Sequence, residues 1–458
     1  MPEGKDLFEK AAEAPARVLE KTVEVSESAT SFITKKKPLQ KVSDYWHMLG
    51  PGLTTGASDD DPSGIATYSQ TGAQYGNQLL WLAAFTFPLM AIVQEMCARI
   101  GMVTGQGLAA NIRKYYSKKV LFICTILLFA ANTFNIGADL GAMAKATQLL
   151  WPNGGFVLLI VGFTIISLLL QIFSTYAKYA KYLKYLALIL LSYVLSTLLI
   201  KGLDWQAIAR AAITPSFDLT KDKIILICAI LGTTISPYLF FWQTSQEVEE
   251  EILEGKTTLA QRQVVDPGQI KRMRVDVWSG MLLSNVVMFF IIVACAATLF
   301  IGGGTEITTA ADAAEALRPL AGDATYLLFA LGIIGTGLLA VPVLAGSASY
   351  AVAESFGWKE GLFYKLKQAY AFYGVLIVAM LLGLGMNFIG LDPMKALIYS
   401  AVANGLVAPI VLVLIVLLSS NKKIMGEWSN GPVVRVLGWV ITILMIVAGV
   451  ATIGSLVV

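Results

Sequence analysis

Two apolar stretches long enough to span a membrane are each interrupted by a proline set among polar residues. In the first, Asp59, Asp60 and Asp61 directly precede Pro62, and in the second, Pro237 lies in a polar run. Proline removes a backbone hydrogen bond and breaks a helix. Helices broken at matching places in two halves of a membrane protein are the best sequence indication of a binding site near the midplane. Because consecutive carboxylates at that depth must face a cation or water, the two breaks predict an ion-binding site.

The composition is that of a polytopic membrane protein. Hydrophobic residues make up 56% and charged residues 14%, with a mean hydropathy of +0.68. The net charge of +3 does not indicate a nucleic-acid partner, because the basic residues fall in loops. The N-terminus lacks the pattern of a cleaved signal peptide. Four cysteines lie in apolar runs and are expected to be core residues: Cys97, Cys124, Cys228 and Cys295.

Eleven apolar segments are long enough to cross a bilayer core of roughly 30 Å at about 1.5 Å per residue. Residues 1–44, which precede them, are charged and are expected to form a cytoplasmic tail with a short amphipathic helix. The expected spans are 47–75 (broken), 78–103, 119–149, 154–174, 180–201, 223–243 (broken), 276–301, 324–352, 364–388, 394–419 and 433–457.

Basic residues gather in the loops after spans 2, 4, 8 and 10, whereas the opposite loops are acidic or mixed. Because short cytoplasmic loops are enriched in Lys and Arg, the N-terminus is expected in the cytoplasm and the C-terminus outside the cell. The loop 244–275 differs, since five glutamates precede its basic residues; we expect a solvated surface helix followed by a basic re-entry segment. The basic residues of the other loops are Arg113, Lys114, Lys118, Lys119, Lys178, Lys181, Lys184, Lys359, Lys365, Lys367, Lys422 and Lys423.

Several motifs resemble those of the NRAMP family of divalent-metal transporters. Residues 50–52 (GPG) match the entry to the family's first span, and residues 97–105 (CARIGMVTG) resemble its A-R-L-G-x-V-T-G signature at the end of span 2. The family's Asp-Pro-Gly-Asn motif appears as residues 61–64 (DPSG), and its Ala-x-x-Met-Pro-His motif as residues 233–238 (TTISPY). The resemblance covers most of the chain, from residue 47 to about residue 418.

This resemblance implies an all-α membrane protein with the LeuT-type fold. Such a fold has eleven transmembrane helices here, in two inverted five-helix repeats whose helices 1 and 6 are broken. The first repeat would comprise residues 45–205, the second residues 223–420, and residues 430–458 would form span 11. The resemblance also implies transported divalent metal ions, no enzymatic activity and no cofactor. We expect a monomer in the plasma membrane.

Departures from the family pattern fall on the expected metal ligands. In the family, the first-span Asp and Asn, the sixth-span Met sulfur and the Ala carbonyl bind a dehydrated transition metal. Here Asp61 remains, whereas Gly64 replaces the Asn, Ser236 replaces the Met, and Thr233 occupies the Ala position. The resemblance therefore implies that these four residues form the metal site. The substitutions resemble those of the NRAMP-related magnesium transporter branch.

The chemistry of the remaining donors also favours magnesium. A thioether suits thiophilic metals, whereas carboxylate, hydroxyl, carbonyl and water oxygens suit Mg²⁺, Ca²⁺ or Mn²⁺. Mg²⁺ gives up its waters reluctantly and usually touches only one or two carboxylates. Since Gly64 and Ser236 remove both volume and specific ligands, we expect a wider, all-oxygen site for a partly hydrated ion. Asp61 could alternatively cap a half-helix, and Asp59 and Asp60 either contact the ion or its waters or attract cations towards it.

The proton pathway that the resemblance implies lacks its titratable groups. NRAMP proteins place an Asp and a Glu on span 3 and a His on span 6, where this chain has Asn135, Ala138 and Tyr238. None of these titrates near neutral pH, so we expect that proton symport is lost. Asp139, about 100° further around the helix, is either a displaced relay or a partner for Lys145 or for a tilted neighbour.

Five other polar residues lie at or near the expected spans. Asn404 in span 10 and Gln243 at the inner end of span 6 could line the ion pathway. Glu95 and Arg99 are spaced to pair across one helical turn. His47 is expected at the membrane edge rather than as a ligand.

Other functional classes fit less well. Residues 255–258 (GKTT) lack the glycine that a phosphate-binding loop needs five residues earlier, and no His-Glu-x-x-His motif indicates a protease. A carboxylate substrate, as in a LeuT-type amino-acid symporter, would be repelled by the three aspartates. The sequence predicts a secondary transporter or facilitator that imports Mg²⁺ and also Mn²⁺ by alternating access without proton coupling. Two alternatives stay open: a proton-coupled Mn²⁺/Fe²⁺ NRAMP symporter and a Mg²⁺ channel.

Overall fold

The computed structural model describes residues 49–173, 190–216, 218, 220–301, 307, 310–315, 322 and 325–457, and all regular elements in these ranges are helices. The expected N-terminal tail, His47 and the basic loop after span 4 lie outside them. The helices are α3 (Pro51–Asp59), α4 (Pro62–Tyr75), α5 (Trp81–Thr104), α6 (Leu108–Tyr115), α7 (Lys118–Leu150), α8 (Phe156–Phe173), α10 (Leu191–Leu199), α11 (Trp205–Ile213), α12 (Lys221–Thr234), α13 (Pro237–Leu253), α14 (Leu259–Arg262), α15 (Pro267–Cys295), η2 (Ala296–Phe300), α16 (Ala310–Glu315), α18 (Thr325–Phe356), η4 (Leu366–Gln368), α19 (Tyr370–Met386), α20 (Pro393–Ser420), α21 (Lys422–Met425), η5 (Gly426–Trp428) and α22 (Pro432–Val457).

The described helices follow the predicted order of membrane spans. Among them, eight segments are long and apolar enough to cross a membrane: α5, α7, α8, α12 with α13, α15 with η2, α18, α20 and α22. α19 is a shorter apolar helix. α3 and α4 occupy the place of the broken first span, and α10 lies in the second half of the predicted fifth span. The total of eleven spans stays a prediction.

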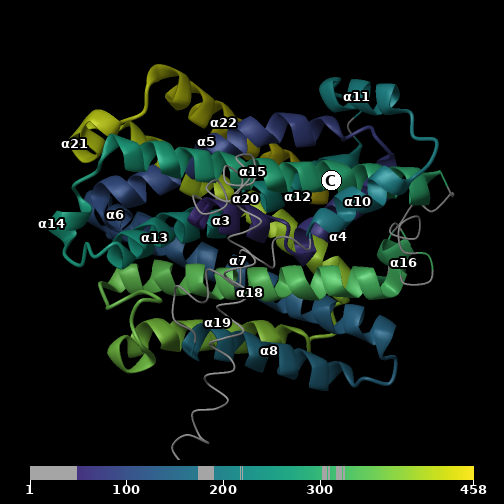
Figure 1. Cartoon of the computed structure of the whole chain (residues 1–458), viewed down its shortest axis with the longest axis horizontal. Coiled ribbons are helices and arrows are strands. Elements are labelled where there is room, and N and C mark those ends of the chain that lie inside the picture. The colour runs from purple at the N-terminus through teal and green to yellow at the C-terminus, as the bar shows by residue number, and fades with distance from the viewer. Residues whose placement is uncertain are drawn as a thin grey trace, which may run out of the picture. The chain divides into compact units, whose positions relative to one another are not determined.

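The two broken helices lie in the middle of the bundle (Figure 1). α3 and α4 cross its centre between α15 on one side and α7 and α18 on the other, and α20 packs against both α4 and α7. α3 packs most extensively against α15, α12 against α20, and α7 against α18. The polar residues at both breaks are thereby enclosed by continuous helices.

Both predicted helix breaks are confirmed. Residues 60–61 separate α3 from α4, and residues 235–236 separate α12 from α13. Pro62 and Pro237 each open the second half-helix, where a missing N–H removes no hydrogen bond. The residue just before each proline starts the second half-helix, since the Asp61 carbonyl accepts from Ile65 N at 3.0 Å and the Ser236 carbonyl from Leu239 N at 3.2 Å.

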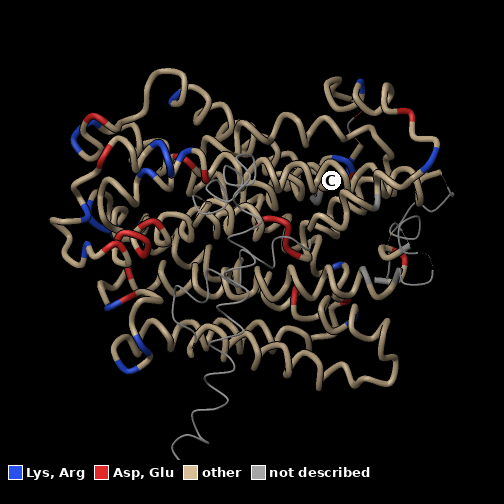
Figure 2. Tube along the Cα trace, viewed as in Figure 1, with Lys and Arg blue, Asp and Glu red and all other residues tan. Residues whose placement is uncertain are grey.

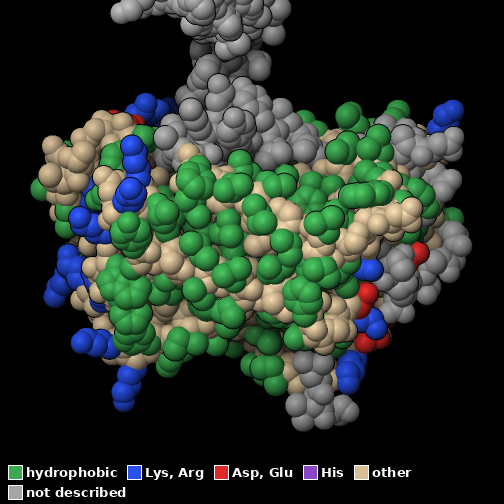
Figure 3. All heavy atoms as spheres, turned by 90° about the horizontal axis from the view of Figure 1, so that it is seen from below, with side chains coloured by type: hydrophobic (Ala, Val, Ile, Leu, Met, Phe, Trp, Pro, Cys, Tyr) green, Lys and Arg blue, Asp and Glu red, His purple; other side chains and the backbone are tan. Residues whose placement is uncertain are grey.

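Charged residues mark one end of the bundle and its centre (Figure 2). Many Lys and Arg residues gather at the end that holds α6, α14 and α21, which we call the basic end, whereas an acidic stretch lies in the middle, between α3 and α4. One face of the molecule is covered mainly by hydrophobic side chains, with Lys and Arg towards its edges (Figure 3). This distribution is the one expected of helices embedded in a membrane.

The segment 244–275 differs from its prediction. α13 continues to Leu253 and α15 already begins at Pro267. Glu247, Glu249 and Glu251 are buried within the fold, so the prediction of a solvated surface helix is wrong. For Glu249 the local run of charges could not reveal this, because its hydrogen-bond donors, Tyr350 Oη and Leu362 N, lie about a hundred positions further along the chain. Glu247 and Glu251 are instead paired locally, with Gln243 and Lys256.

The start of α3 is capped by a residue of another span. The first amides of a helix have no acceptor within it, and here Asp276 of α15 accepts hydrogen bonds from Gly50 N, Gly52 N and Leu53 N at 2.8, 2.6 and 3.1 Å. One turn further on, the two backbones touch, since a Cβ atom on Gly56 would lie 2.2 Å from the carbonyl oxygen of α15 residue 280. α3 is therefore held against α15 by a buried carboxylate and by close backbone packing.

Gly56→Ala is expected to destabilise the protein, because the added methyl group would overlap the backbone of α15. Overpacking of this kind typically costs about 1–3 kcal/mol. Gly162 in α8 has nothing within 4 Å of the corresponding position, so Gly162→Ala should be neutral or stabilising by up to about 1 kcal/mol. Thermal unfolding of both purified variants measures the difference, and equal melting temperatures would contradict the close contact.

Candidate ion-binding site

Asp61 stands at the break of the first span and accepts hydrogen bonds with both carboxylate oxygens. It is the N-cap of α4, and its Oδ1 accepts from Gly64 N at 2.7 Å and from Ser63 Oγ at 2.6 Å. Its Oδ2 accepts from Asn135 Nδ2 on α7 at 2.8 Å. Helix capping, the alternative role considered from the sequence, is thus confirmed as a contact. The cap uses Oδ1 of Asp61, whereas Oδ2 has one hydrogen-bond partner, Asn135.

The two helix breaks meet at Gly64 and Thr233. A Cβ atom on Gly64 would lie 3.1 Å from Thr233 Oγ1 and 3.0 Å from the carbonyl oxygen of Asp59. Ser236 lies in the second break, and its Oγ donates to the carbonyls of Gly232 and Thr233 at 2.6 and 2.8 Å. Gly64 and Thr233 are therefore neighbours, whereas the Ser236 hydroxyl turns back to its own chain. Metal ligation by these residues stays a prediction.

Asp59 and Asp60 are contacted by α15. Ser284 Oγ donates to Asp59 Oδ2 at 2.6 Å and lies 3.4 Å from Asp60 Oδ1. Asp59 Oδ1 and Asp60 Oδ2 have no hydrogen-bond partner within the described part of the chain. Nothing in the sequence around Ser284 distinguished it, because only the packing of α15 against α3 brings it to these carboxylates.

On α7, Asn135 connects two carboxylates. Its Nδ2 donates to Asp61 Oδ2 at 2.8 Å and to Asp139 Oδ2 at 3.2 Å. Its Oδ1 accepts from Asn404 Nδ2 of α20 at 3.2 Å. Ala138 is buried on the same helix. Asn404, named from the sequence as a pathway residue, thus bonds the residue that connects the two carboxylates.

The remaining predicted residues are distributed around this centre. Tyr238 Oη donates to the carbonyl of Ser58 at 2.7 Å and so links the second broken span to the first. Gln243 lies more than one turn after Tyr238 on α13, and its Nε2 donates to Glu247 Oε1 at 2.8 Å. Lys145, considered as a partner of Asp139, instead lies with its Nζ 5.4 Å from the centre of the Phe156 ring.

Four carboxylates are buried around the first break without a counter-charge. Asp59, Asp60, Asp61 and Asp139 are each at most 1% exposed, and the ion pairs found among the described residues involve none of them. Buried carboxylates are costly unless a cation is paired with them. In the same residues, no three acidic, His or Cys side chains converge as ligands of one metal ion.

The profile of one protein family, described as natural resistance-associated macrophage protein-like (Nramp), matches residues 52–455. The chain belongs to the NRAMP family. Among its relatives, the divalent metal cation transporter MntH of Pectobacterium carotovorum subsp. carotovorum is 25% identical over 405 residues, which cover 87% of this chain and 92% of the relative. The protein of the same name from Klebsiella pneumoniae is 25% identical over 416 residues, covering 89% and 94%.

Solved structures of low sequence identity share the fold of this NRAMP protein. The Eremococcus coleocola manganese transporter, in complex with an aromatic bis-isothiourea compound, aligns with a TM-score of 0.69 at 19% identity and covers 88% of this chain and 85% of its own. Mhp1, a nucleobase-cation-symport-1 family transporter in a closed conformation, aligns with a TM-score of 0.56 at 15% identity and covers 88% and 90%. The LeuT-type fold that the motifs implied is confirmed.

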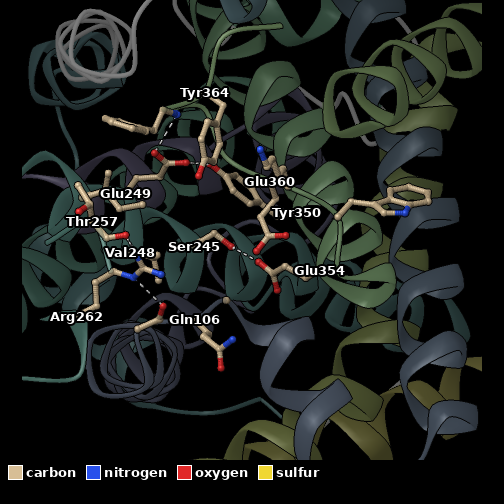
Figure 4. A pocket seen from close by; sticks show the side chains of 16 residues that line it. Gln106, Ser245, Val248, Glu249, Thr257, Arg262, Tyr350, Glu354, Glu360 and Tyr364 are labelled. Atoms are coloured by element: carbon tan, nitrogen blue, oxygen red, sulfur yellow. Dashed lines mark hydrogen bonds between the residues drawn. The ribbon is translucent and has the colours of Figure 1, made fainter. Parts of the chain in front are cut away.

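A polar cavity at the basic end of this NRAMP protein was not foreseen from the sequence (Figure 4). It measures about 250 Å³ and is lined by residues of α13, α14, α18 and the loops that follow α5, α13 and α18. Glu249 Oε1 accepts from Tyr350 Oη at 2.6 Å and from Leu362 N at 2.7 Å, and Glu354 Oε1 accepts from Ser245 Oγ at 3.0 Å. These bonds connect α13, α18 and the loop beyond it.

The third carboxyl group of this cavity belongs to Glu360, in the loop after α18. Burial, together with the nearby carboxylate of Glu354, raises the pKa of Glu360 to about 8. Near neutral pH its neutral form is therefore favoured. The residues at the two helix breaks do not line the cavity, so it is a feature separate from the candidate ion site.

Other local predictions agree with the structure of this NRAMP chain. Arg99 and Glu95 are paired at 3.8 Å. Glu95 also accepts from Arg274 Nη2 at 2.9 Å and from Trp278 Nε1 at 2.8 Å, which connects α5 to α15. All four cysteines are buried and free, as expected of core residues.

Proposed function

We propose that this NRAMP protein is a secondary transporter or facilitator, not an enzyme, and that it carries divalent metal ions by alternating access. Its cargo would be Mg²⁺ in partly hydrated form and also Mn²⁺. The observation that carries the proposal is the set of four buried aspartates at the first break, because no described ion pair neutralises them. Two relatives are named divalent metal cation transporters and one solved relative is a manganese transporter. A divalent cation would supply the missing positive charge.

Support for Mg²⁺ comes from the donor atoms at the two breaks. Asp61, Thr233 and Ser236 offer only oxygen, and Gly64 offers no side chain. Oxygen ligands suit Mg²⁺ and Mn²⁺, whereas the thioether of the family motif favours softer metals. A carboxylate or two with retained water is the usual way in which proteins bind Mg²⁺.

Support for uncoupled transport comes from α7 and α13. Asn135, Ala138 and Tyr238 cannot exchange protons near neutral pH, and the first and last of them make fixed hydrogen bonds to Asp61 and to the Ser58 carbonyl. Without proton coupling, the ion would follow its own electrochemical gradient.

The rival functions make different predictions. A proton-coupled Mn²⁺ or Fe²⁺ symporter, with Asp139 as a displaced relay, would acidify the vesicle interior during uptake. A Mg²⁺ channel would give unitary currents, whereas a carrier saturates. The burial of all four aspartates favours a carrier, since the site is closed in this conformation.

We further propose a monomer in the plasma membrane with the basic end and the N-terminus in the cytoplasm, following the positive-inside rule.

Asp61→Ala is expected to abolish Mg²⁺ and Mn²⁺ uptake into proteoliposomes, because it removes the central carboxylate. It also removes a helix cap, which typically contributes about 0.5–2 kcal/mol. Asp204→Ala is a matched control, because Asp204 caps α11 by accepting hydrogen bonds from two backbone amides at 3.0 Å. Asp204 lies far from the breaks in sequence. This control should transport like the parent. Ser236→Ala should have a smaller effect than Asp61→Ala, since water can replace a hydroxyl. Parental uptake by Asp61→Ala would show that the site is wrongly assigned.

Restoring the family's ligands should shift selectivity towards Mn²⁺. The variant Gly64→Asn with Ser236→Met and Thr233→Ala adds an amide and a thioether, which occupy the space of water and favour softer metals. The Thr233→Ala change also makes room, because Thr233 Oγ1 would lie 3.1 Å from the new Cβ atom. The ratio of initial Mg²⁺ to Mn²⁺ uptake rates measures the effect, with Thr233→Ala alone as control. An unchanged ratio in the folded triple variant would count against a hydrated cargo.

Metal uptake is expected to proceed without proton entry. A pH-sensitive dye inside proteoliposomes should show no acidification while a metal gradient drives uptake, and a pH gradient at fixed voltage should not concentrate metal. An inside-negative potential provides about 2 × 2.3 kcal/mol per 100 mV for a divalent ion, or roughly a thousandfold accumulation. Stoichiometric proton entry that disappears in Asp139→Asn would overturn this prediction.

A further inference from the structure

Asp139 is a buried carboxylate that the proposed four-residue metal site does not use. It lies in the middle of α7 and is 0% exposed. Its Oδ1 has no hydrogen-bond partner among the residues that the structure describes. Its neighbour in sequence that could have neutralised it, Lys145, lies against Phe156 instead. Ionisable residues buried in membrane spans are costly and mark ion pathways, so a role in binding the cargo is the first hypothesis for Asp139.

The position of Asp139 relative to Asp61 is fixed by a shared donor. Asn135 Nδ2 lies 2.8 Å from Asp61 Oδ2 and 3.2 Å from Asp139 Oδ2, so the two oxygens are at most 6.0 Å apart. Mg²⁺ binds oxygen at about 2.0–2.1 Å, and a metal-bound water donates to a carboxylate over about 2.5–2.7 Å. One carboxylate in direct contact and a second reached through a water can therefore be up to about 6–7 Å apart. The observed separation falls within this limit.

Asn404 keeps the shared donor in its orientation. A carboxylate only accepts hydrogen bonds, so the nitrogen of Asn135, not its oxygen, must face Asp61 and Asp139. The oxygen then points to α20, where Asn404 Nδ2 donates to it at 3.2 Å. A rotation of the Asn135 amide by half a turn would place oxygen against carboxylate and nitrogen against nitrogen. Asn404 thus opposes that rotation.

We propose that Asp139 is a second cargo-binding carboxylate, which holds the metal ion through one of its retained waters while Asp61 contacts the ion directly. Asn135, oriented by Asn404, is the positioning residue that sets the spacing of the two. This inference rests on the proposed transport of hydrated divalent ions and names the residue that recognises the hydration shell. Asp139 would then favour ions that keep their water, such as Mg²⁺, over Mn²⁺, which can exchange that water for a carbonyl at the breaks.

The test compares Mg²⁺ and Mn²⁺ uptake by full-length parent and Asp139→Asn in proteoliposomes. Asparagine keeps the shape of the side chain and an acceptor for Asn135, but it removes the charge. The KM for Mg²⁺ should rise about tenfold or more, the change expected for one charge-assisted hydrogen bond, while the KM for Mn²⁺ changes less than about threefold. Asp204→Asn, at the remote cap of α11, should change neither. Asn404→Ala should alter the Mg²⁺/Mn²⁺ ratio in the same direction by a smaller factor.

Hexaamminecobalt(III) provides an independent probe, because this inert complex resembles a hydrated Mg²⁺ ion and binds only through its ligand shell. It should inhibit Mg²⁺ uptake by the parent and lose about tenfold of its potency against Asp139→Asn. If Asp139→Asn does not fold, as judged by its melting temperature, Asp139→Ala carries the same expectations.

The outcomes separate the inference from the function on which it rests. A parent protein that transports neither metal would refute the proposed function. A parent that transports both, together with an Asp139→Asn variant whose two KM values are unchanged, would overturn the role of Asp139. Equal increases in both KM values would also overturn it, since they would indicate a direct ligand or general electrostatic attraction rather than recognition of water. A loss of melting temperature or kcat with an unchanged Mg²⁺/Mn²⁺ ratio would indicate a purely structural residue.

Discussion

A carboxylate in the middle of a bilayer is tolerated only when its surroundings provide partners, and this constraint organises the centre of the protein. Asp61 takes hydrogen bonds from the start of α4 and from α7, and Asp59 takes one from α15. Because two of these partners lie on other spans, the break of the first span is held between α7 and α15. The partners are all neutral, however. They orient the aspartates without cancelling their charge, so a positive ion remains the missing component.

Breaking a membrane helix creates two additional helix ends, and each end needs hydrogen-bond partners. The starts of α4, α13 and α3 obtain these partners in three different ways. α4 is capped by its own Asp61, α13 begins with a proline and has no side-chain cap, and α3 is capped by Asp276 of a distant span. The proposed ion site lies at the two positions where the regular helices of the spans are interrupted.

The sequence predicted those features that depend on local chemistry. Pro62 and Pro237 marked the breaks because proline limits any helix, whatever surrounds it. The apolar runs located the spans because a membrane helix needs about 20 apolar residues, whatever packs against it. By contrast, Ser284 and Asp276 act on residues more than two hundred positions away, and no local pattern distinguishes them. Glu249 was mispredicted as solvated, since its burial depends on Tyr350 and on the amides of the loop after α18.

The capping of α3 by Asp276 also bears on biosynthesis. Asp276 lies 226 positions after Gly50, so the ribosome has produced the first six spans before the acceptor for the α3 amides exists. During that time α3, which contains two glycines in nine residues, has little intrinsic tendency to be helical. The close backbone contact with α15 is also unavailable until then. α3 is therefore synthesised first among the described helices but can become fully ordered only after α15 has entered the membrane.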